Sequence, residues 1–237
     1  MRVTVASAEL SLGPSDTTRT VDAVLFDMDG VLVDSERFWH AFEDEWVFAE
    51  ATEGTPTREE VTGRNYREMY DYLSTEYGTT VSKEEFVARY DEHAMDVVYG
   101  DGVVLMEGAE ELFDDLRAGV KLAIVSSAPQ EWIAVVRERF DLDPLDLVLS
   151  ADDIDAPGKP EPHIYEHAAA ELGVDPGNCV VVEDSYNGIA AAVAAGTYCI
   201  AYRTAQNRDV DLSAADEVVE GPAELRGALS RLVGIDA

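Results

Sequence analysis

Several side chains able to bind or transfer charged groups stand at the ends of apolar runs in this sequence. They comprise the acids Asp27, Asp29, Glu183 and Asp184, the hydroxyls of Ser126 and Ser127, and the amine of Lys159. In an open parallel sheet, ligands gather beyond the carboxyl ends of the strands. Acids placed there can bind a hard cation or exchange protons, and a lysine with hydroxyls can bind an anion.

Each of these segments alone has an ordinary explanation. An Asp-x-Asp-Gly sequence, here at 27–30, occurs in calcium loops and in simple turns. Paired serines, as at 126–127, can cap a helix, and a lone lysine such as Lys159 is usually exposed to solvent. The meaning of the segments therefore depends on whether the fold brings them together.

The stretches between these segments predict alternating strands and helices. Runs of β-branched and aromatic residues predict strands at 21–26, 121–125, 145–149, 179–182, 198–201 and 217–219. Apolar residues at helical spacing predict helices at 110–117, 130–140, 162–172, 186–195 and 223–232. This alternation predicts an α/β fold with a doubly wound parallel (Rossmann-like) sheet and right-handed crossovers.

Residues 35–98 differ from the rest of the chain because their aromatic residues recur at spacings of three and four and no strand pattern interrupts them. We therefore expect a helical domain at 35–98, inserted into an α/β core formed by 21–34 and 99–237. The polar stretch 1–20 is expected to be an N-terminal extension.

The chain carries 49 acidic and 17 basic residues, spread along its length, for a formal net charge of −32. Such a surface disfavours nucleic acid or a membrane as partner, because both attract basic proteins. The self-repulsion is screened in molar salt, where the Debye length falls to about 3 Å. A composition with few lysines and many acids is similar to that of proteins from salt-in halophiles. A halophilic habitat is therefore our hypothesis.

The sequence gives no sign of membrane insertion or export. No apolar run reaches the length of a membrane span, and residues 1–20 lack a cationic start followed by an apolar stretch. We therefore expect a cytoplasmic protein, either a monomer or a weak dimer. Cys179 and Cys199 lie inside apolar runs, which is typical of buried thiols.

Taken together, in this order and each at a predicted strand or loop end, the motif segments resemble the haloacid dehalogenase-like (HAD) superfamily. The resemblance is to the branch with a helical cap inserted after the first motif, and within it to the phosphatases and the β-phosphoglucomutase-like group. It covers about residues 21–235. Its most specific part is the pattern Asp-x-Asp-Gly-x-x-x-Asp-Ser at 27–35.

The resemblance implies a small phosphate ester as substrate and a role for each motif residue. Asp27 would attack phosphorus and form an aspartyl-phosphate, while Asp29 would protonate the leaving oxygen and then deprotonate water. Lys159 would neutralise the phosphoryl oxygens, and Ser126 and Ser127 would bind them.

The resemblance also implies Mg²⁺, which prefers hard oxygen ligands and keeps some of its waters. The matching ligands are the carboxylates of Asp27 and Asp184 and the backbone carbonyl of Asp29, with Glu183 acting through a metal-bound water. Without the ion, these carboxylates and a phosphate dianion would repel one another.

Two other polar residues near the motifs have simpler expected roles. Asp34 is expected to close the first loop as a hydrogen-bond acceptor. Asn187 either touches the water shell of the metal or begins a helix.

The substrate specificity is expected to come from the helical cap. Arg64 and Asn65 lie between predicted helices, where caps of this kind present a specificity loop. Arg64 would grip a second anionic group, or else be an ordinary exposed arginine. Trp39, Phe42 and Trp46 at helical spacing indicate cap core rather than a substrate shelf.

Three alternatives compete with a Mg²⁺-dependent phosphatase. A β-phosphoglucomutase-like enzyme would carry His twelve residues after the nucleophile, where this chain has Trp39; His40 lies one residue later, roughly 100° round the helix. A true dehalogenase would need neither Asp29 nor Mg²⁺. A non-catalytic binding protein on the same fold would usually lack one of the charged site residues, which are all present here.

Overall fold

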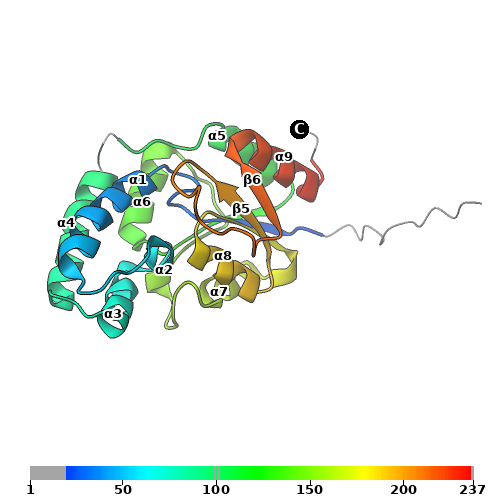
Figure 1. Cartoon of the computed structure of the whole chain (residues 1–237). Helices are drawn as coiled ribbons and strands as arrows, with labels where there is room; N and C mark the ends of the chain where they lie inside the picture. The colour runs from blue at the N-terminus through cyan, green and yellow to red at the C-terminus, as the bar shows by residue number, and fades with distance from the viewer. Residues whose placement is uncertain (1–19, 99, 101, 236–237) are drawn as a thin grey trace, which may run out of the picture.

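The computed structural model describes residues 20–98, 100 and 102–235. The predicted extension at 1–20 therefore lies outside the described residues, except for Thr20. The described chain forms an α/β core with a group of helices at one end (Figure 1).

The six strands found in the described part of the chain form one parallel sheet, in the order β3-β2-β1-β4-β5-β6. They are β1 (Ala23–Phe26), β2 (Lys121–Ser126), β3 (Leu147–Ser150), β4 (Cys179–Glu183), β5 (Tyr198–Arg203) and β6 (Glu217–Glu220). The four residues of β1 are completely buried. A central parallel strand is covered on both faces, and for this reason its sequence is continuously apolar.

Helices cover both faces of the sheet (Figure 1). One face packs on α5 (Ala109–Arg117), α6 (Gln130–Phe140) and α9 (Gly221–Val233). The other packs on α7 (His163–Leu172) and α8 (Tyr186–Ala194). Successive side chains of β1 point to opposite faces, with Phe26 in the first core and Leu25 in the second.

The helices between β1 and α5 form the group at the end of the molecule in Figure 1, which we call the cap. They are α1 (Glu36–Phe42), the π-helix η1 (Glu43–Ala51), α2 (Arg58–Val61), α3 (Tyr66–Glu76) and α4 (Lys83–Val98). Phe42 and Phe86 are buried inside the cap and contact the ring of Trp46. The cap therefore has an aromatic core of its own.

The predicted fold class is confirmed. Every predicted core strand and helix is present, with boundaries that differ by a few residues at most. The division into domains at 35–98 stays a prediction. No helix in the described part of the chain is long and apolar enough to cross a membrane.

Candidate active site

The strand register brings the first and last acidic motifs together. β1 lies between β2 and β4, and Phe26 is in register with Ile124 and Val182. Asp27, the next residue, donates its backbone N–H to the carbonyl of Val182 at 3.0 Å. The Asp27 side chain consequently emerges beside Glu183, the last residue of β4.

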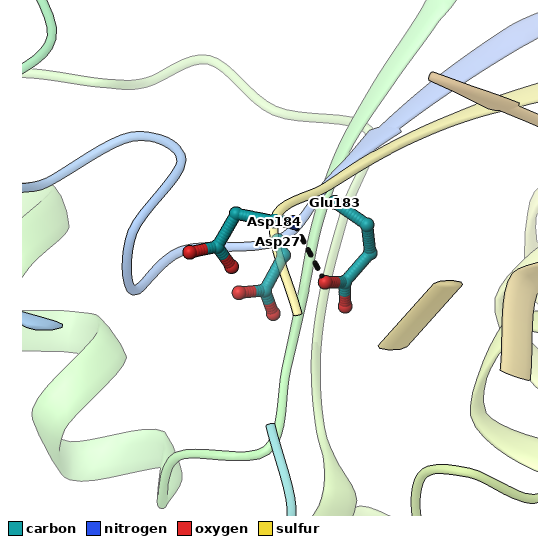
Figure 2. A group of neighbouring side chains, drawn as sticks. All are labelled: Asp27, Glu183 and Asp184. Carbon is teal, nitrogen blue, oxygen red and sulfur yellow. Dashed lines mark hydrogen bonds between the residues drawn. The ribbon is translucent and has the colours of Figure 1, made fainter. Parts of the chain in front are cut away.

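Three buried acids form a cluster at this edge of the sheet. Carboxylate oxygens of Asp27, Glu183 and Asp184 lie within 4.8 Å of one another (Figure 2). Burial raises the pKa of Asp27 to about 8, against the opposing effect of Lys159. Burial, reinforced by neighbouring carboxylates, also raises the pKa of Asp184 well above its usual value. Such a cluster cannot be fully ionised without added positive charge.

Lys159 is the cation of the described residues that contacts this cluster directly. Its Nζ lies 2.7 Å from Asp27 Oδ1 and 2.6 Å from Glu183 Oε1, and the side chain is 1% exposed. Burial alone would lower the pKa of Lys159, but the two carboxylates outweigh it and raise the pKa above its usual value. The lysine is therefore charged and fixed at the nucleophile expected from the sequence.

The carboxylate of Glu183 accepts hydrogen bonds at both oxygens. Oε1 accepts from Lys159 Nζ and, at 2.9 Å, from Tyr165 Oη. Oε2 accepts from the backbone N–H of Asp184 at 2.9 Å, drawn as a dashed line in Figure 2, and from both N–H and Oγ of Ser185. Burial would raise the pKa of Glu183, but Lys159 outweighs it and the pKa is lowered. Glu183 thus holds Lys159 in place.

The glycine of the first motif leaves room for Asp184. Gly30 has a φ of +80°, a conformation that side chains rarely adopt. A Cβ built on Gly30 would lie 2.1 Å from Asp184 Oδ2 and 2.8 Å from Cγ of Glu36. Both conformation and space therefore require glycine beside the acid cluster.

Asp29 faces the same region from the loop after β1. Its Oδ1 accepts hydrogen bonds from Ser35 Oγ and, at 3.3 Å, from Trp39 Nε1. Burial raises the pKa of Asp29 to about 6, while the hydrogen bonds from Ser35 and Trp39 act to lower it. An acid that titrates near neutral pH can both give and take a proton.

The two serines after β2 have different surroundings. Ser126 is buried, lines the cavity described below, and accepts a hydrogen bond from the N–H of Ala128 at 3.1 Å. The hydroxyl of Ser127 donates to the backbone carbonyl of Gly63 in the cap, at 2.7 Å. Ser127 therefore joins core and cap, and its expected role in phosphate binding stays a prediction.

A cavity of about 80 Å³ lies between the cap and the acid cluster. Its lining includes Asp27, Asp29, Asp184, Ser126 and Ser127 from the core motifs. Cap residues form the opposite side, among them Glu36, Glu43, Thr62 and Arg64. One buried water needs about 10–15 Å³ on such a scale, so the cavity suits a small molecule.

Four aromatic rings stack around this cavity, and we call them the ring cluster: Trp39, Tyr66, Tyr90 and Trp132. The Trp39 and Trp132 rings are 5.6 Å apart at 17°, and Trp39 lies 6.1 Å from Tyr90 at 20°. Tyr66 completes the cluster, 5.3 Å from both Trp132 and Tyr90. Since Trp132 belongs to α6, the cluster joins the cap to the core.

Trp39 packs against the core cluster, as expected, but it is only partly buried and also lines the cavity, because α1 directs it toward the loop that carries Asp29. The same expectation is confirmed for Phe42, which is buried, and for Trp46, which packs against Phe42 and Phe86.

The two cap residues expected to set specificity differ in position. Arg64 lines the cavity, but its Nε donates to the Glu60 carbonyl at 2.7 Å and its guanidinium lies 4.6 Å from the centre of the Tyr72 ring. Asn65 is buried, caps α3, and donates to the carbonyl of Ser127 at 3.0 Å. Both roles in specificity stay predictions.

Asp34 and Asn187 show how the loops around the site are held. Asp34 Oδ1 accepts the N–H of Val104 at 2.7 Å, which confirms its expected loop-closing role. Asn187 lies in the first turn of α8, whose cap is Ser185, and its amide donates to the carbonyls of Glu59 and Thr62 at 3.0 and 2.7 Å. Asn187 therefore joins the core to the cap through hydrogen bonds. Its contact with the water shell of a metal stays a prediction.

Sequence reasoning missed part of the site. Glu36 and Glu43 are buried acids that line the cavity, and Tyr165 supports Glu183 from α7. Glu43 contacts Arg58 at 2.9 Å, and burial raises the pKa of Glu43 to about 8. Acids within a helix that carries many acids give no signal in the sequence, whereas Glu36 directly follows the Asp-Ser pair of the first motif.

Comparison with known proteins settles the family. The chain matches the family described as haloacid dehalogenase-like hydrolase over residues 21–196. The chain belongs to the haloacid dehalogenase-like hydrolases. It is therefore an enzyme of this family, and the resemblance inferred from its motifs is confirmed.

Several relatives are named as phosphatases. The chain is 32% identical over 209 residues to "Validoxylamine A 7'-phosphate phosphatase" of Streptomyces hygroscopicus subsp. limoneus, covering 85% of this chain and 94% of that protein. It is 32% identical over 192 residues to "Hexitol phosphatase B" of Escherichia coli K12, covering 76% and 82%. The enzyme is accordingly a haloacid dehalogenase-like phosphatase.

The fold has close counterparts among solved structures. A putative β-phosphoglucomutase from Bacteroides vulgatus has a TM-score of 0.73 and 26% identity, covering 91% of this chain and 90% of that one. This match includes the helical cap as well as the sheet, since it extends over nearly the whole of both chains.

Proposed function

We propose that the protein hydrolyses a small sugar or polyol phosphate through an aspartyl-phosphate formed on Asp27, with Mg²⁺ as cofactor. The observation that carries this proposal is the contact of 2.7 Å between Lys159 Nζ and the buried Asp27, beside two further buried carboxylates. A buried lysine beside a carboxylate is suited to holding phosphoryl oxygens near a nucleophile.

The residues present fit a hard divalent cation. Three carboxylates lie within 4.8 Å of one another, and Asp27 and Asp184 have raised pKa values because burial, reinforced by neighbouring carboxylates, disfavours their charged forms. We assign Asp27, Asp184 and the backbone carbonyl of Asp29 as ligands. Glu183 is already bonded at both oxygens, and we expect it to act through a water molecule and through Lys159. When bound, Mg²⁺ supplies positive charge that offsets the carboxylates and the phosphate.

In the first step, an Asp27 oxygen forms a bond to phosphorus and the bond from phosphorus to the ester oxygen breaks. The leaving oxygen takes a proton from Asp29, so that an alcohol departs. Lys159 holds the phosphoryl oxygens in line with Asp27. The protein is left with an aspartyl-phosphate on Asp27 and an ionised Asp29.

In the second step, water attacks the same phosphorus and gives a proton to Asp29. The bond between phosphorus and the Asp27 oxygen breaks, which releases inorganic phosphate and restores both acids. The raised pKa of Asp29, about 6, suits a group that alternates between the two forms near neutral pH.

The cavity supports a sugar or polyol as the rest of the substrate. Its walls combine the ring cluster with polar groups such as Glu43 and Thr62. Aromatic faces pack against the C–H groups of sugars, while polar groups accept or donate hydrogen bonds to hydroxyls. The Thr62 hydroxyl has no hydrogen-bond partner among the described residues, which leaves it available to a ligand. One of the relatives named above, the hexitol phosphatase of Escherichia coli, acts on a polyol phosphate, as its name states.

The test is phosphate release from a panel of sugar, polyol and nucleoside phosphates in molar KCl with Mg²⁺. We expect the wild type to hydrolyse some of them and Asp27→Asn to release none while remaining folded. Asp141→Asn, the same substitution at an exposed residue of left-handed conformation, is the matched control and should keep full activity. Activity of Asp27→Asn near the wild-type level, or a folded wild type inactive on all esters, would contradict the proposal.

A further inference from the structure

Trp39 of the cap donates a hydrogen bond to the acid expected to transfer protons. Its Nε1 lies 3.3 Å from Asp29 Oδ1, the oxygen that also accepts from Ser35 Oγ. No described residue bonds the other oxygen, Oδ2. The two donors therefore fix one side of the carboxyl and leave Oδ2 for the proton that moves.

The indole of Trp39 is itself held on several sides. It stacks on Trp132 and on Tyr90, and the His93 ring meets it edge-on at 5.6 Å. Stacked partners limit the tilt of the ring, and the helix α1 limits its position along the cavity. The direction of the Nε1–H bond is consequently set by packing.

We propose that Trp39 is a positioning residue for proton transfer by Asp29. This inference rests on the proposed function, because it presumes that Asp29 gives a proton to the leaving oxygen. Trp39 holds Oδ1 through the indole N–H, so Oδ2 carries the proton toward the ester oxygen as the phosphorus–oxygen bond breaks. The indole neither gains nor loses a proton in this step.

The alternative is that Trp39 serves only as a wall of the cavity. If Trp39 were only a wall, its substitution would change the hydrolysis of all substrates that reach it to the same extent. Phenylalanine at this position would then largely preserve the function of the indole. Positioning of a proton donor has a different signature, because its effect depends on how much the leaving group needs the proton.

The experiment compares Trp39→Phe with the wild type on two esters with Mg²⁺ present. A hexitol phosphate releases an alkoxide that must be protonated, whereas p-nitrophenyl phosphate releases a stable anion. We expect kcat/KM for the hexitol phosphate to fall by about 10- to 100-fold. The decrease for p-nitrophenyl phosphate should be at least tenfold smaller. Equal losses on both esters would overturn the proposal.

Trp46→Phe is the matched control, since Trp46 also packs in the cap but makes no contact with Asp29 in the described structure. It should leave the ratio of the two kcat/KM values unchanged. A double-mutant cycle adds a second criterion: in an Asp29→Asn background, Trp39→Phe should cause little further loss on the hexitol phosphate. Fully multiplicative losses would overturn the proposal.

A spectroscopic measurement separates this inference from the proposed function. The indole N–H resonance of Trp39, assigned through its absence in Trp39→Phe, should shift in Asp29→Asn but not in Asp141→Asn. If the folded wild type hydrolysed no ester of the panel, the proposed function would fail, whereas an indole resonance insensitive to Asp29→Asn would refute the contact itself.

Discussion

Lys159 Nζ lies 2.6 Å from Glu183 Oε1, and neither side chain is more than 1% exposed. Because Glu183 is anchored by Tyr165 and the N–H groups of the β4–α8 turn, it fixes the position of the lysine, which also contacts Asp27. Glu183 thus holds the Lys159 ammonium at a defined position beside Asp27, the proposed nucleophile.

Lys159→Ala should therefore lose transition-state stabilisation on the order of 2–4 kcal/mol, by analogy with removal of one oxyanion donor. The measurement is kcat/KM on the best ester of the panel, with folding checked by circular dichroism. Lys83→Ala, at a partly exposed lysine bonded to Asp71, is the control and should keep the wild-type value. An unchanged rate in Lys159→Ala would mean that the lysine only maintains structure.

Removal of the metal should abolish catalysis, and Mg²⁺ should restore it. The raised pKa values of Asp27 and Asp184 mean that the metal-free site holds protons near neutral pH. Binding of Mg²⁺ should then release protons, and its affinity should rise as the pH increases toward about 8. Calorimetric titration in two buffers of different ionisation enthalpy measures the release. Undiminished activity in EDTA would exclude the cofactor.

Glu43 should make stability depend on pH. Its folded pKa of about 8 lies above its usual 4.5, so its contribution to stability is complete below the unfolded pKa and is lost as pH rises through about 8. Glu43→Gln stays neutral, so its free energy of unfolding relative to wild type should increase between pH 5 and pH 9 by an amount on the order of a few kcal/mol.

Urea unfolding at several pH values measures this difference. Glu45→Gln is the matched control, two residues further along the same helix and exposed. It should stay within about 0.5 kcal/mol of wild type at each pH. A Glu43→Gln variant that lost stability relative to wild type as the pH rose would show that the buried acid is ionised and stabilising.

The net charge of −32 predicts that salt stabilises the fold. The free energy of unfolding should be larger in molar KCl than in about 0.1 M KCl, because screening reduces repulsion among the acids. Glu138→Gln and Glu171→Gln, both at exposed positions, should together reduce this dependence on salt. Easier unfolding in molar KCl would contradict the hypothesis of a halophilic origin.

The sheet and the acid cluster could be predicted because their determinants are local. Runs such as 179–182 are apolar along their whole length, and a motif that directly follows such a buried run must lie at the edge of the sheet. The positions of Asp27 and Asp184 then depend on strand order alone.

The cap side of the site could not be predicted in the same way. Whether Trp39 faces the core or the cavity depends on how α1 packs against α4 and α6, and these contacts join residues far apart in the sequence. The same holds for Asn187, whose bonds to Glu59 and Thr62 exist only once the cap rests on the core. Residue type at these positions carries no signal of the partner.

The ring cluster also gives the protein an optical property. The protein has three tryptophans. Two of them, Trp39 from the cap and Trp132 from the core, are stacked against each other on the wall of the cavity. Their near-ultraviolet dichroism and fluorescence arise from a place where a substrate would rest. Entry of a ligand, or separation of the two helices, should therefore change the native emission of the protein without any added dye.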